Sequence, residues 1–364
     1  MNMFFIEPIR NFYGRFERPI SSLSLISGFI FDAVTLKRVD TLWENIWILG
    51  HLLIVGIFII LIHVQEKEEG DEANPGRKHF WYVNILQFFF GGILSTYLVF
   101  YFRSADIFAT WPFIALLVGA FWANESLKRH YMRFSFQISL FYISIYSFAI
   151  FLVPIILHKI GMWIFLLSGL VSLVFIFAFI SILSYFVKRE FAESKKLIIS
   201  LILGITVLVN VLYFTNLIPP MPLSLKDADV YHFIEKNNAG NYVVAYEDSS
   251  WREYFDLYPD FNKPTGASVY AFSAIFSPKN LNITIVHEWQ YYNETQDKWI
   301  TDKIINLPVK GGRDGGFRTY SMRSNIGRGK WRVNIKTEYG QTIGHLRFQI
   351  LSSDTEPELT IEVK

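Results

Sequence analysis

A chain of 364 residues in which 52% are hydrophobic and 35 are phenylalanine is too apolar for an ordinary soluble protein and indicates a membrane protein. The formal net charge of +2 argues against a nucleic-acid-binding protein. The sequence contains no cysteine, which excludes disulfides, thiolate metal sites and cysteine nucleophiles together.

The first 222 residues contain seven apolar stretches, and a helix needs roughly 20 such residues to cross a bilayer. They lie near 20–36, 42–64, 80–102, 107–123, 131–157, 160–187 and 197–217. The first is the weakest, because it is short, carries four serines and has Asp32 near its end. An interfacial or re-entrant helix is the alternative there. We therefore expect a polytopic α-helical membrane bundle of about seven spans.

Lysine and arginine are distributed unevenly between the two sides of this bundle. Thirteen fall on one side: Arg10, Arg15, Arg18, Lys67, Arg77, Lys78, Lys128, Arg129, Arg133, Lys188, Arg189, Lys195 and Lys196. Four fall on the other: Lys37, Arg38, Arg103 and Lys159. Because short cytoplasmic loops are enriched in basic residues, we expect the chain after the seventh span to lie outside the cytoplasm.

Few ionisable side chains lie within the expected spans, where they would mark a site of transport or chemistry. The candidates are Asp32, Glu44, His51 and Glu125. They support an alternative interpretation, in which the protein is a membrane-embedded enzyme or transporter. For His51, an interhelical hydrogen bond is the competing explanation.

The composition changes at Leu217–Pro222, and no stretch long enough to span a membrane follows. We expect 223–241 to be a connector, in which Val230–Lys236 forms a short helix or turn, and a β domain over 242–364. Alternating segments predict strands at 267–276, 282–292, 298–309, 317–322, 330–338, 341–350 and 359–363.

The alternation within Asn282–Tyr292 places His287 and Trp289 on one face of a strand and Glu288 on the other. His287 and Glu288 therefore cannot act together on one substrate, and Ser321 has no histidine at a spacing typical of catalysis. Short strands at regular spacing are typical of an all-β immunoglobulin-like sandwich. We expect Trp289 and Trp331 at the centre of its core.

One segment of the β domain is strongly basic. Residues 310–336 contain eight lysines and arginines against one acid, whereas the remainder of 223–364 has nine basic and seventeen acidic residues. The candidate anion ligands in this glycine-rich segment are Arg313, Arg318, Arg328 and Arg332. Arginine pairs two oxygens of a phosphate or a sugar acid, so we expect the first three to converge at one edge of the sandwich. The alternative is that the glycines supply positive φ angles and the arginines cover a solvated sheet face.

A set of motifs in this region resembles a known family. They are His287-x-Trp289, Gly311–Arg313, Arg318–Ser321, and Gly329–Val333 followed by Gly340. Together they resemble the bacterial domain of unknown function 2914 over Ile285–Ile350, and Ile218–Ser224 resembles its membrane-anchored members. The resemblance implies a protein of the bacterial cell envelope and implies no particular activity.

These observations predict an integral protein of the bacterial cytoplasmic membrane that uses an external sandwich for binding rather than for catalysis. The expected partners are the lipid bilayer and either another envelope protein or an anionic glycan. We expect no nucleic acid, cofactor or metal.

Overall fold

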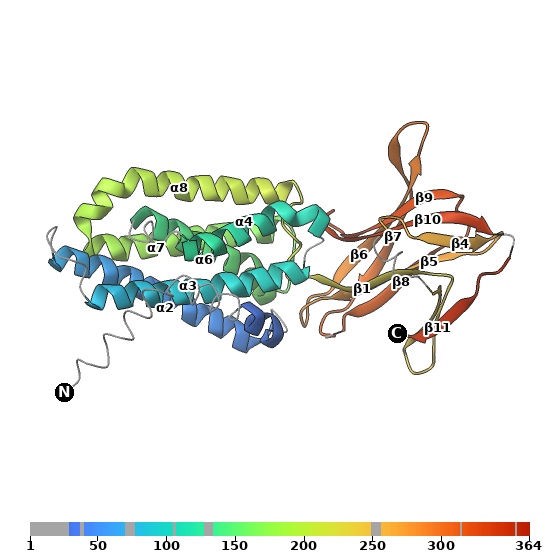
Figure 1. The fold of residues 1–364 in the computed structure, drawn as a ribbon, viewed down its shortest axis with the longest axis horizontal. Helices are drawn as coiled ribbons and strands as arrows, with labels where there is room; N and C mark the ends of the chain where they lie inside the picture. Colours follow the sequence, from blue (N-terminus) through green and yellow to red (C-terminus); the bar gives the residue numbers. More distant parts are fainter. Residues whose placement is uncertain are drawn as a thin grey trace, which may run out of the picture. The chain divides into compact units, whose positions relative to one another are not determined.

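The computed structural model describes residues 29–36, 40–69, 77–104, 107–126, 134–248, 256–313, 315–353 and 355–364. The chain forms two compact units, a helical unit made mainly of residues up to Leu217 and a β-rich unit made mainly of Ile218–Lys364 (Figure 1). The predicted order of a helical region followed by a β region is therefore correct.

The helical unit is built from long helices preceded by a shorter helical segment at 29–35. The long helices are α2 (Leu42–Glu69), α3 (Arg77–Ser104), α4 (Ile107–Ser126), α6 (Phe134–Leu157), α7 (Met162–Phe186) and α8 (Lys188–Phe214). Among the described residues, five helices are long and apolar enough to cross a membrane, namely α2, α3, α6, α7 and α8. The structure thus supports five spans where the sequence predicted seven.

The two remaining predicted spans differ in what the structure describes of them. The apolar part of α4 covers only Thr110–Trp122. Most of the first predicted span, 20–36, lies outside the described residues. One predicted loop is also helical, because α8 begins directly after Val187 and includes Lys195 and Lys196 in its first turns.

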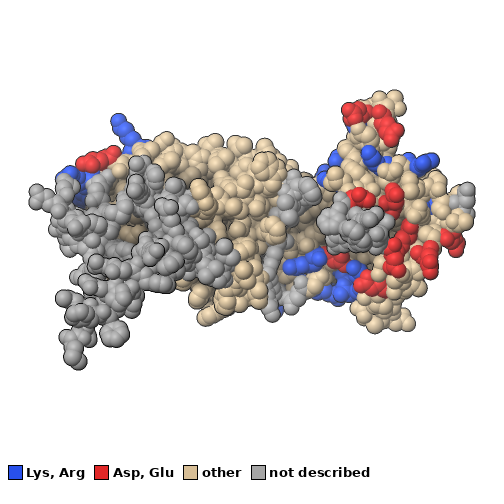
Figure 2. Space-filling model, in the orientation of Figure 1, with Lys and Arg blue, Asp and Glu red and all other residues tan. Residues whose placement is uncertain are grey.

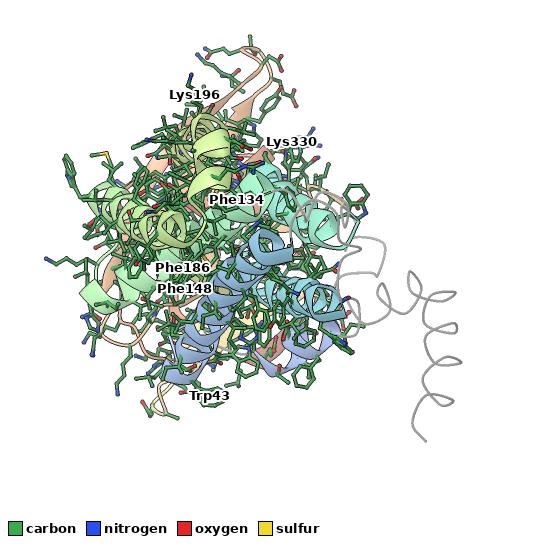
Figure 3. All side chains as sticks on the ribbon, turned by 90° about the vertical axis from the view of Figure 1, so that its left-hand side faces the viewer. Trp43, Phe134, Phe148, Phe186, Lys196 and Lys330 are labelled. Carbon is green, nitrogen blue, oxygen red and sulfur yellow. The ribbon has the colours of Figure 1, made fainter. Side chains whose placement is uncertain are left out.

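Contacts between helices in this unit combine aromatic rings with a few polar bonds. The Tyr97 and Tyr101 hydroxyls donate to the backbone carbonyls of Ser144 and Ser147 at 2.8 and 3.0 Å. The outside of the unit carries large apolar side chains, including Trp43, which is 72% exposed. Figure 3 shows Trp43 at the edge of the bundle and the buried Phe134 toward its centre.

α8 ends in a hydrogen-bonded C-terminal cap. Asn216 has a φ angle of 57°, and its N–H donates to the carbonyl of Tyr213, while the Leu217 N–H donates to Leu212. This pair of bonds is the Schellman arrangement, which satisfies the last carbonyls of a helix and turns the chain away from its axis. The proline-rich segment that follows contains a cis peptide between Met221 and Pro222.

The described residues of the β-rich unit form three sheets. Its strands are β1 (Ser224–Tyr231), β2 (Phe233–Lys236), β3 (Tyr242–Glu247), β4 (Asp260–Pro264), β5 (Val269–Phe276), β6 (Ile283–Asn293), β7 (Lys298–Val309), β8 (Phe317–Arg323), β9 (Gly329–Thr337), β10 (Thr342–Ser353) and β11 (Leu359–Val363). The sheet orders are β1-β5-β8, β4-β10-β9-β6-β7 and β11-β3-β2. All neighbouring pairs are antiparallel except β4 and β10.

The main core lies between the first two of these sheets. Val269, Ala271 and Ile275 of β5 pack with Trp289 and Val333 from the five-stranded sheet in one buried cluster. The third sheet packs against the opposite face of β5, where Phe272 and Ala274 meet a cluster rich in tyrosine. β5 is therefore buried on both faces, and the unit has three layers rather than the two of the expected sandwich.

The segment 223–241, which we expected to be a connector, contains β1 and β2. Leu223 and Tyr231 are almost fully buried, and Val230–Lys236, expected to be a helix or turn, is mostly strand. The periodicity is hard to recognise because Asp227 and Asp229 interrupt the apolar positions of β1. The folded β unit thus begins earlier than the sequence indicated.

Candidate functional site

The four predicted arginines do not lie together. Arg313 and Arg318 are near the start of β8, where the Arg313 guanidinium lies 5.7 Å from the Phe317 ring centre and Arg318 donates to the Asn241 side chain at 3.4 Å. Arg328 follows the other end of β8, and Arg332 belongs to β9. Seven strand residues span roughly 20 Å, so the structure does not bring the arginines to one edge.

The glycine-rich loop before β8 has a structural explanation. A Cβ atom on Gly311 would lie 1.9 Å from the Pro278 carbonyl oxygen, so no other residue fits there. Gly316 has a φ angle of 83°. The amide N–H of Gly312 already donates to the Ser277 carbonyl at 2.9 Å, and that of Gly316 donates to the Arg313 carbonyl at 3.1 Å. These amides are therefore engaged within the fold and do not form an anion cradle.

The outer face of the five-stranded sheet, opposite the core, carries a continuous polar network. We call it the outer-face network, and its members are Glu288, Gln290, Thr301, Arg332, Asn334, Lys336 and His345. Lys336 Nζ lies 2.5 Å from Glu288 Oε2, and Asn334 Nδ2 donates to the same oxygen at 2.9 Å. Arg332 Nε donates to Gln290 Oε1 at 2.6 Å. The network therefore joins β6, β7, β9 and β10 side chain to side chain.

The electrostatics of the network are dominated by Glu288. Partial burial opposes ionisation of its carboxyl group, but hydrogen bonds from Lys336, Asn334 and Thr301 outweigh it and lower the pKa of Glu288 to about 2. Glu288 is therefore an anion at neutral pH and an acceptor that holds its neighbours in place. A carboxylate this well satisfied is a positioning group rather than a proton donor or base.

Aromatic rings extend the network at one end. The Arg332 guanidinium lies 4.3 Å from the centre of the Trp299 ring, and Lys330 Nζ lies 5.4 Å from the centre of the Tyr258 ring. The Tyr258 and Trp299 rings are nearly parallel, with centres 6.2 Å apart and an angle of 14° between them. Tyr292 packs against Trp299 at 5.2 Å. We call Tyr258, Tyr292, Trp299, Lys330 and Arg332 the arginine–aromatic platform.

A second polar cluster lies on the inner face of the same strand. His287 is fully buried and is hydrogen-bonded through Nε2 to Ser273 Oγ at 2.9 Å and through Nδ1 to Ser321 Oγ at 2.8 Å. Trp289 Nε1 donates to Ser321 Oγ at 2.9 Å. The two residues are 34 positions apart, so their spacing gave no sign of this contact, which forms because the two strands meet across the core.

This inner cluster holds the two sheets together rather than performing chemistry. Ser273 and Ser321 are at most 3% exposed, so no substrate reaches the histidine between them. Burial lowers the pKa of His287 to about 4, which keeps the ring neutral. Both tryptophans that we expected in the core are buried. Trp289 is completely buried, and 5% of Trp331 is exposed.

Two of the polar residues predicted in the membrane, Asp32 and His51, lie within electrostatic range of each other. The Asp32 carboxyl group lies beside the Ser95 hydroxyl of α3 and within electrostatic range of His51. His51 Nδ1 donates to the Trp47 carbonyl at 2.9 Å, and its ring packs against Phe89. Among the described side chains, Glu44 does not join this pair. Glu44 is in the first turn of α2, and the side chain of Glu125 is not among those that the structure describes.

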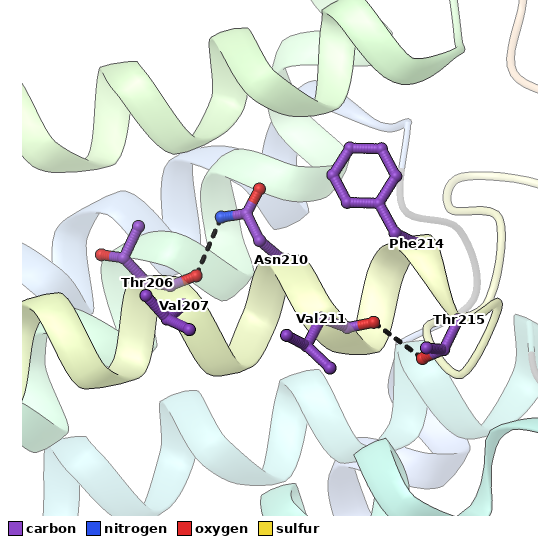
Figure 4. Close-up of a pocket in the computed structure, with 6 residues that line it drawn as sticks. All are labelled: Thr206, Val207, Asn210, Val211, Phe214 and Thr215. Carbon is purple, nitrogen blue, oxygen red and sulfur yellow. Dashed lines mark hydrogen bonds between the residues drawn. The ribbon is translucent and has the colours of Figure 1, made fainter.

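A pocket of about 400 Å³ lies along one helix of the helical unit (Figure 4). It is lined only by residues of α8 and the turn after it: Thr206, Val207, Asn210, Val211, Phe214 and Thr215. Asn210 Nδ2 donates to Tyr146 Oη at 3.2 Å and to the Thr206 carbonyl at 2.8 Å. Its lining is largely apolar and its amide is already bonded, so the pocket offers little for recognising a polar ligand.

Figure 2 shows that most of the lysine, arginine, aspartate and glutamate visible in that view lies on the β-rich unit. No group of three or more His, Cys, Asp or Glu side chains that could hold a metal occurs among the described residues. The chain therefore combines helices of membrane-spanning length with a β-rich unit that carries two polar networks.

Part of the C-terminal half of the chain is similar to a known protein family. The family model described as "Protein of unknown function (DUF2914)" matches residues 282–350, which confirms the resemblance that the motifs indicated. The matched segment starts beside β6 and ends within β10, so it contains His287, Glu288 and Arg332. No curated protein matches the chain.

A solved structure of the Pseudomonas fluorescens alkylpurine DNA glycosylase AlkC, bound to DNA containing an abasic site analog, matches at 8% identity and a TM-score of 0.22. The alignment covers 83% of this chain and 96% of that one. A TM-score this low gives no basis for transferring a fold or a function.

Proposed function

We propose that this chain is a multi-pass protein of the bacterial cytoplasmic membrane whose β-rich unit lies outside the cytoplasm and binds an envelope protein or glycan. The observation that carries the proposal is the outward surface of the long helices. On α7, Trp163, Val174 and Phe175 are 74%, 61% and 61% exposed, a surface that suits lipid and not water. The excess of basic residues in the expected cytoplasmic loops supports the orientation.

Seven spans remain part of the proposal. α4 has 20 residues, which correspond to about 30 Å of helix and so to the thickness of a hydrocarbon core. The helical segment at 29–35 is the described end of the other additional span. With both segments crossing, thirteen basic residues face the cytoplasm and four face the exterior.

The immunoglobulin-like assignment of the β unit is likewise a proposal. It is supported by two mainly antiparallel sheets that enclose one core around Trp289. The parallel pairing of β10 with β4 and the third sheet would be additions to that architecture.

The binding role is tested with the full-length protein, purified in detergent and immobilised through its N-terminus. Envelope glycans and solubilised membrane proteins are passed over it at low and moderate salt. We expect one component to be retained in a defined ratio. The control is the chain ended after Leu217, which keeps the helical unit alone. Equal retention by the full-length protein and this control would contradict a binding role for the β unit.

A membrane-embedded enzyme or transporter is the second candidate, and the proximity of Asp32 and His51 favours it. Ionisable groups that lie near each other within spans often mark a pathway for ions or protons. Against it, the pocket described in the helical unit lies on α8 and includes neither residue. Proteoliposomes that carry wild type or Asp32→Asn, assayed for proton or cation flux, test this candidate. Identical flux in both, equal to that of empty liposomes, would exclude it.

A further inference from the structure

We propose that the arginine–aromatic platform on the outer face of the five-stranded sheet binds an acidic glycan, with its anionic group at Arg332 and Arg347 and its sugar ring against Trp299 and Tyr258. The inference rests on the proposed binding role of the β unit and specifies the ligand class and the surface.

The first argument concerns charge. Arg332 of β9 and Arg347 of β10 are directly opposite each other in the antiparallel register. Like charges at such positions destabilise a sheet, because the side chains stand about 5 Å apart on the same face. Lys330 of β9 lies two residues from Arg332 and therefore on the same face. Glu288 lies within electrostatic range of Arg332, and an anion seated at these side chains would add to the compensation of their positive charge.

The second argument concerns geometry. The bond from Arg332 Nε to Gln290 uses one of the five guanidinium N–H groups, and the Trp299 ring supports the guanidinium plane from one side. Gln290 is itself held, because its Nε2 donates to Thr301 Oγ1 at 2.9 Å. The guanidinium is therefore fixed before a ligand arrives, which reduces the entropic cost of binding. A planar fork in a fixed position suits the two oxygens of a carboxylate.

The third argument explains why the ligand is a sugar. Beside the arginine, Tyr258, Tyr292 and Trp299 present aromatic surface at the end of a polar sheet face. A pyranose ring has an apolar C–H face that packs on aromatic rings and a polar rim that stays in contact with water or hydrogen-bonds to polar side chains.

The binding test uses the full-length protein in detergent and three probes of matched length. They are an oligogalacturonate, the same oligomer after reduction of its carboxyl groups, and oligoglutamate. We expect wild type to bind the oligogalacturonate at least about tenfold more tightly than either of the other two. Binding should weaken with added salt, since the charges are partly exposed.

The variants locate the binding surface. Arg332→Gln and Trp299→Leu should each weaken oligogalacturonate binding by at least about tenfold. Arg313→Gln is the matched control, because Arg313 also lies over an aromatic ring but near the start of β8. It should bind like wild type. Lys330→Gln, at an exposed position, replaces Arg332→Gln if that variant fails to fold.

Several results would overturn the inference. These are equal binding of oligoglutamate and oligogalacturonate, equal loss in Arg313→Gln, or no binding of the acidic oligomer by wild type. Failure of the inference can be distinguished from failure of the proposed function. If the full-length protein retains an envelope component and Arg332→Gln retains it equally, the binding role stands and this surface is excluded.

Discussion

In the helical unit, hydroxyl groups bond largely within their own helix, whereas in the β-rich unit polar side chains bond between strands. Ser139, Ser144 and Ser168 each donate to the carbonyl four residues earlier, at 2.7 to 2.9 Å. On β6, by contrast, His287 bonds to two other strands and Glu288 contacts Lys336 and Asn334 of β9.

The difference reflects the solvent that each unit is built for. A helix whose hydroxyls are satisfied by its own backbone leaves only apolar groups facing outward, as a hydrocarbon environment requires. A sheet face with charged, cross-linked side chains needs water on its open side. The two units therefore satisfy their polar side chains by different routes, within single helices in one and between strands in the other.

The largest effect is expected when the first two strands of the β-rich unit are removed. A fragment of residues 223–364 should be soluble, monomeric and β-rich by circular dichroism. A fragment of 242–364 should be unfolded, because it lacks β1 and β2 and with them the buried Leu223, Tyr231 and Ile234. Losing several such side chains, at about 2–5 kcal/mol each, exceeds the stability of most domains. Cooperative unfolding of both fragments at the same temperature would show that the strands are dispensable.

Substitution of two tryptophans on opposite faces of the five-stranded sheet distinguishes its core face from its outer face. Trp331→Ala should reduce the free energy of unfolding by about 3–5 kcal/mol, because the side chain is buried in the main core. Trp299→Ala, on the outer face, should cost about 1 kcal/mol or less, the scale of a lost cation–π contact. Urea unfolding of the 223–364 fragment measures both. Equal losses would place both tryptophans in the core.

A charge on the outside of α7 tests whether that surface meets lipid. Val174→Arg should disfavour membrane insertion by about 2.5–3.5 kcal/mol if the position lies near the middle of the bilayer. Met322→Arg, at an exposed apolar position of β8, should change stability by less than about 0.5 kcal/mol. The measurement is the fraction of protein recovered in washed membranes. Unchanged recovery of the Val174 variant would contradict a lipid-facing α7.

The buried cluster around His287 predicts that the stability of the β-rich unit depends on pH, with a smaller effect than the substitutions above. Since burial lowers the pKa of His287 from 6.5 to about 4, the unfolded chain binds a proton between these values and the folded chain does not. The contribution of His287 is therefore fully present above pH 6.5 and declines as the pH falls toward 4, by roughly 2 kcal/mol between pH 7 and pH 5.

Urea unfolding of the fragment at pH 7 and pH 5 checks this expectation. His287→Gln removes the titrating ring and keeps a side chain able to bond to Ser273 and Ser321. It should be less stable than wild type at pH 7 but should lose less stability on acidification. The same loss in both proteins would assign the pH dependence to other groups.

Much of this fold could be predicted from sequence, for reasons visible in particular elements. The predicted span 131–157 corresponds to α6 at Phe134–Leu157, and the predicted strand 282–292 corresponds to β6 at Ile283–Asn293. The first is a long, mainly apolar stretch, and in the second the buried positions alternate over most of the strand. β1 was missed because its two aspartates interrupt the pattern, and the third layer was missed because periodicity does not show which sheet covers a strand.

The candidate binding site could be predicted from the sequence only in small part. Arg332 was selected for its charge, but Arg313 and Arg318 were selected on the same ground and lie near the start of β8. Its neighbours Tyr258, Trp299 and Arg347 come from segments far apart in the chain, and only the strand register brings them together. His287 and Ser321 meet across two sheets, and their spacing of 34 residues is not a recognisable signal.

The orientation of the chain is the claim on which the proposed function depends, and the absence of cysteine makes it directly measurable. Single cysteines are placed at Thr295, in the turn between β6 and β7, and at Lys67, near the end of α2. Both variants are treated with a membrane-impermeant maleimide in spheroplasts and after lysis. We expect Thr295→Cys to be labelled in intact spheroplasts and Lys67→Cys only after lysis. Labelling of Lys67→Cys alone in intact spheroplasts would place the β-rich unit in the cytoplasm and contradict the account.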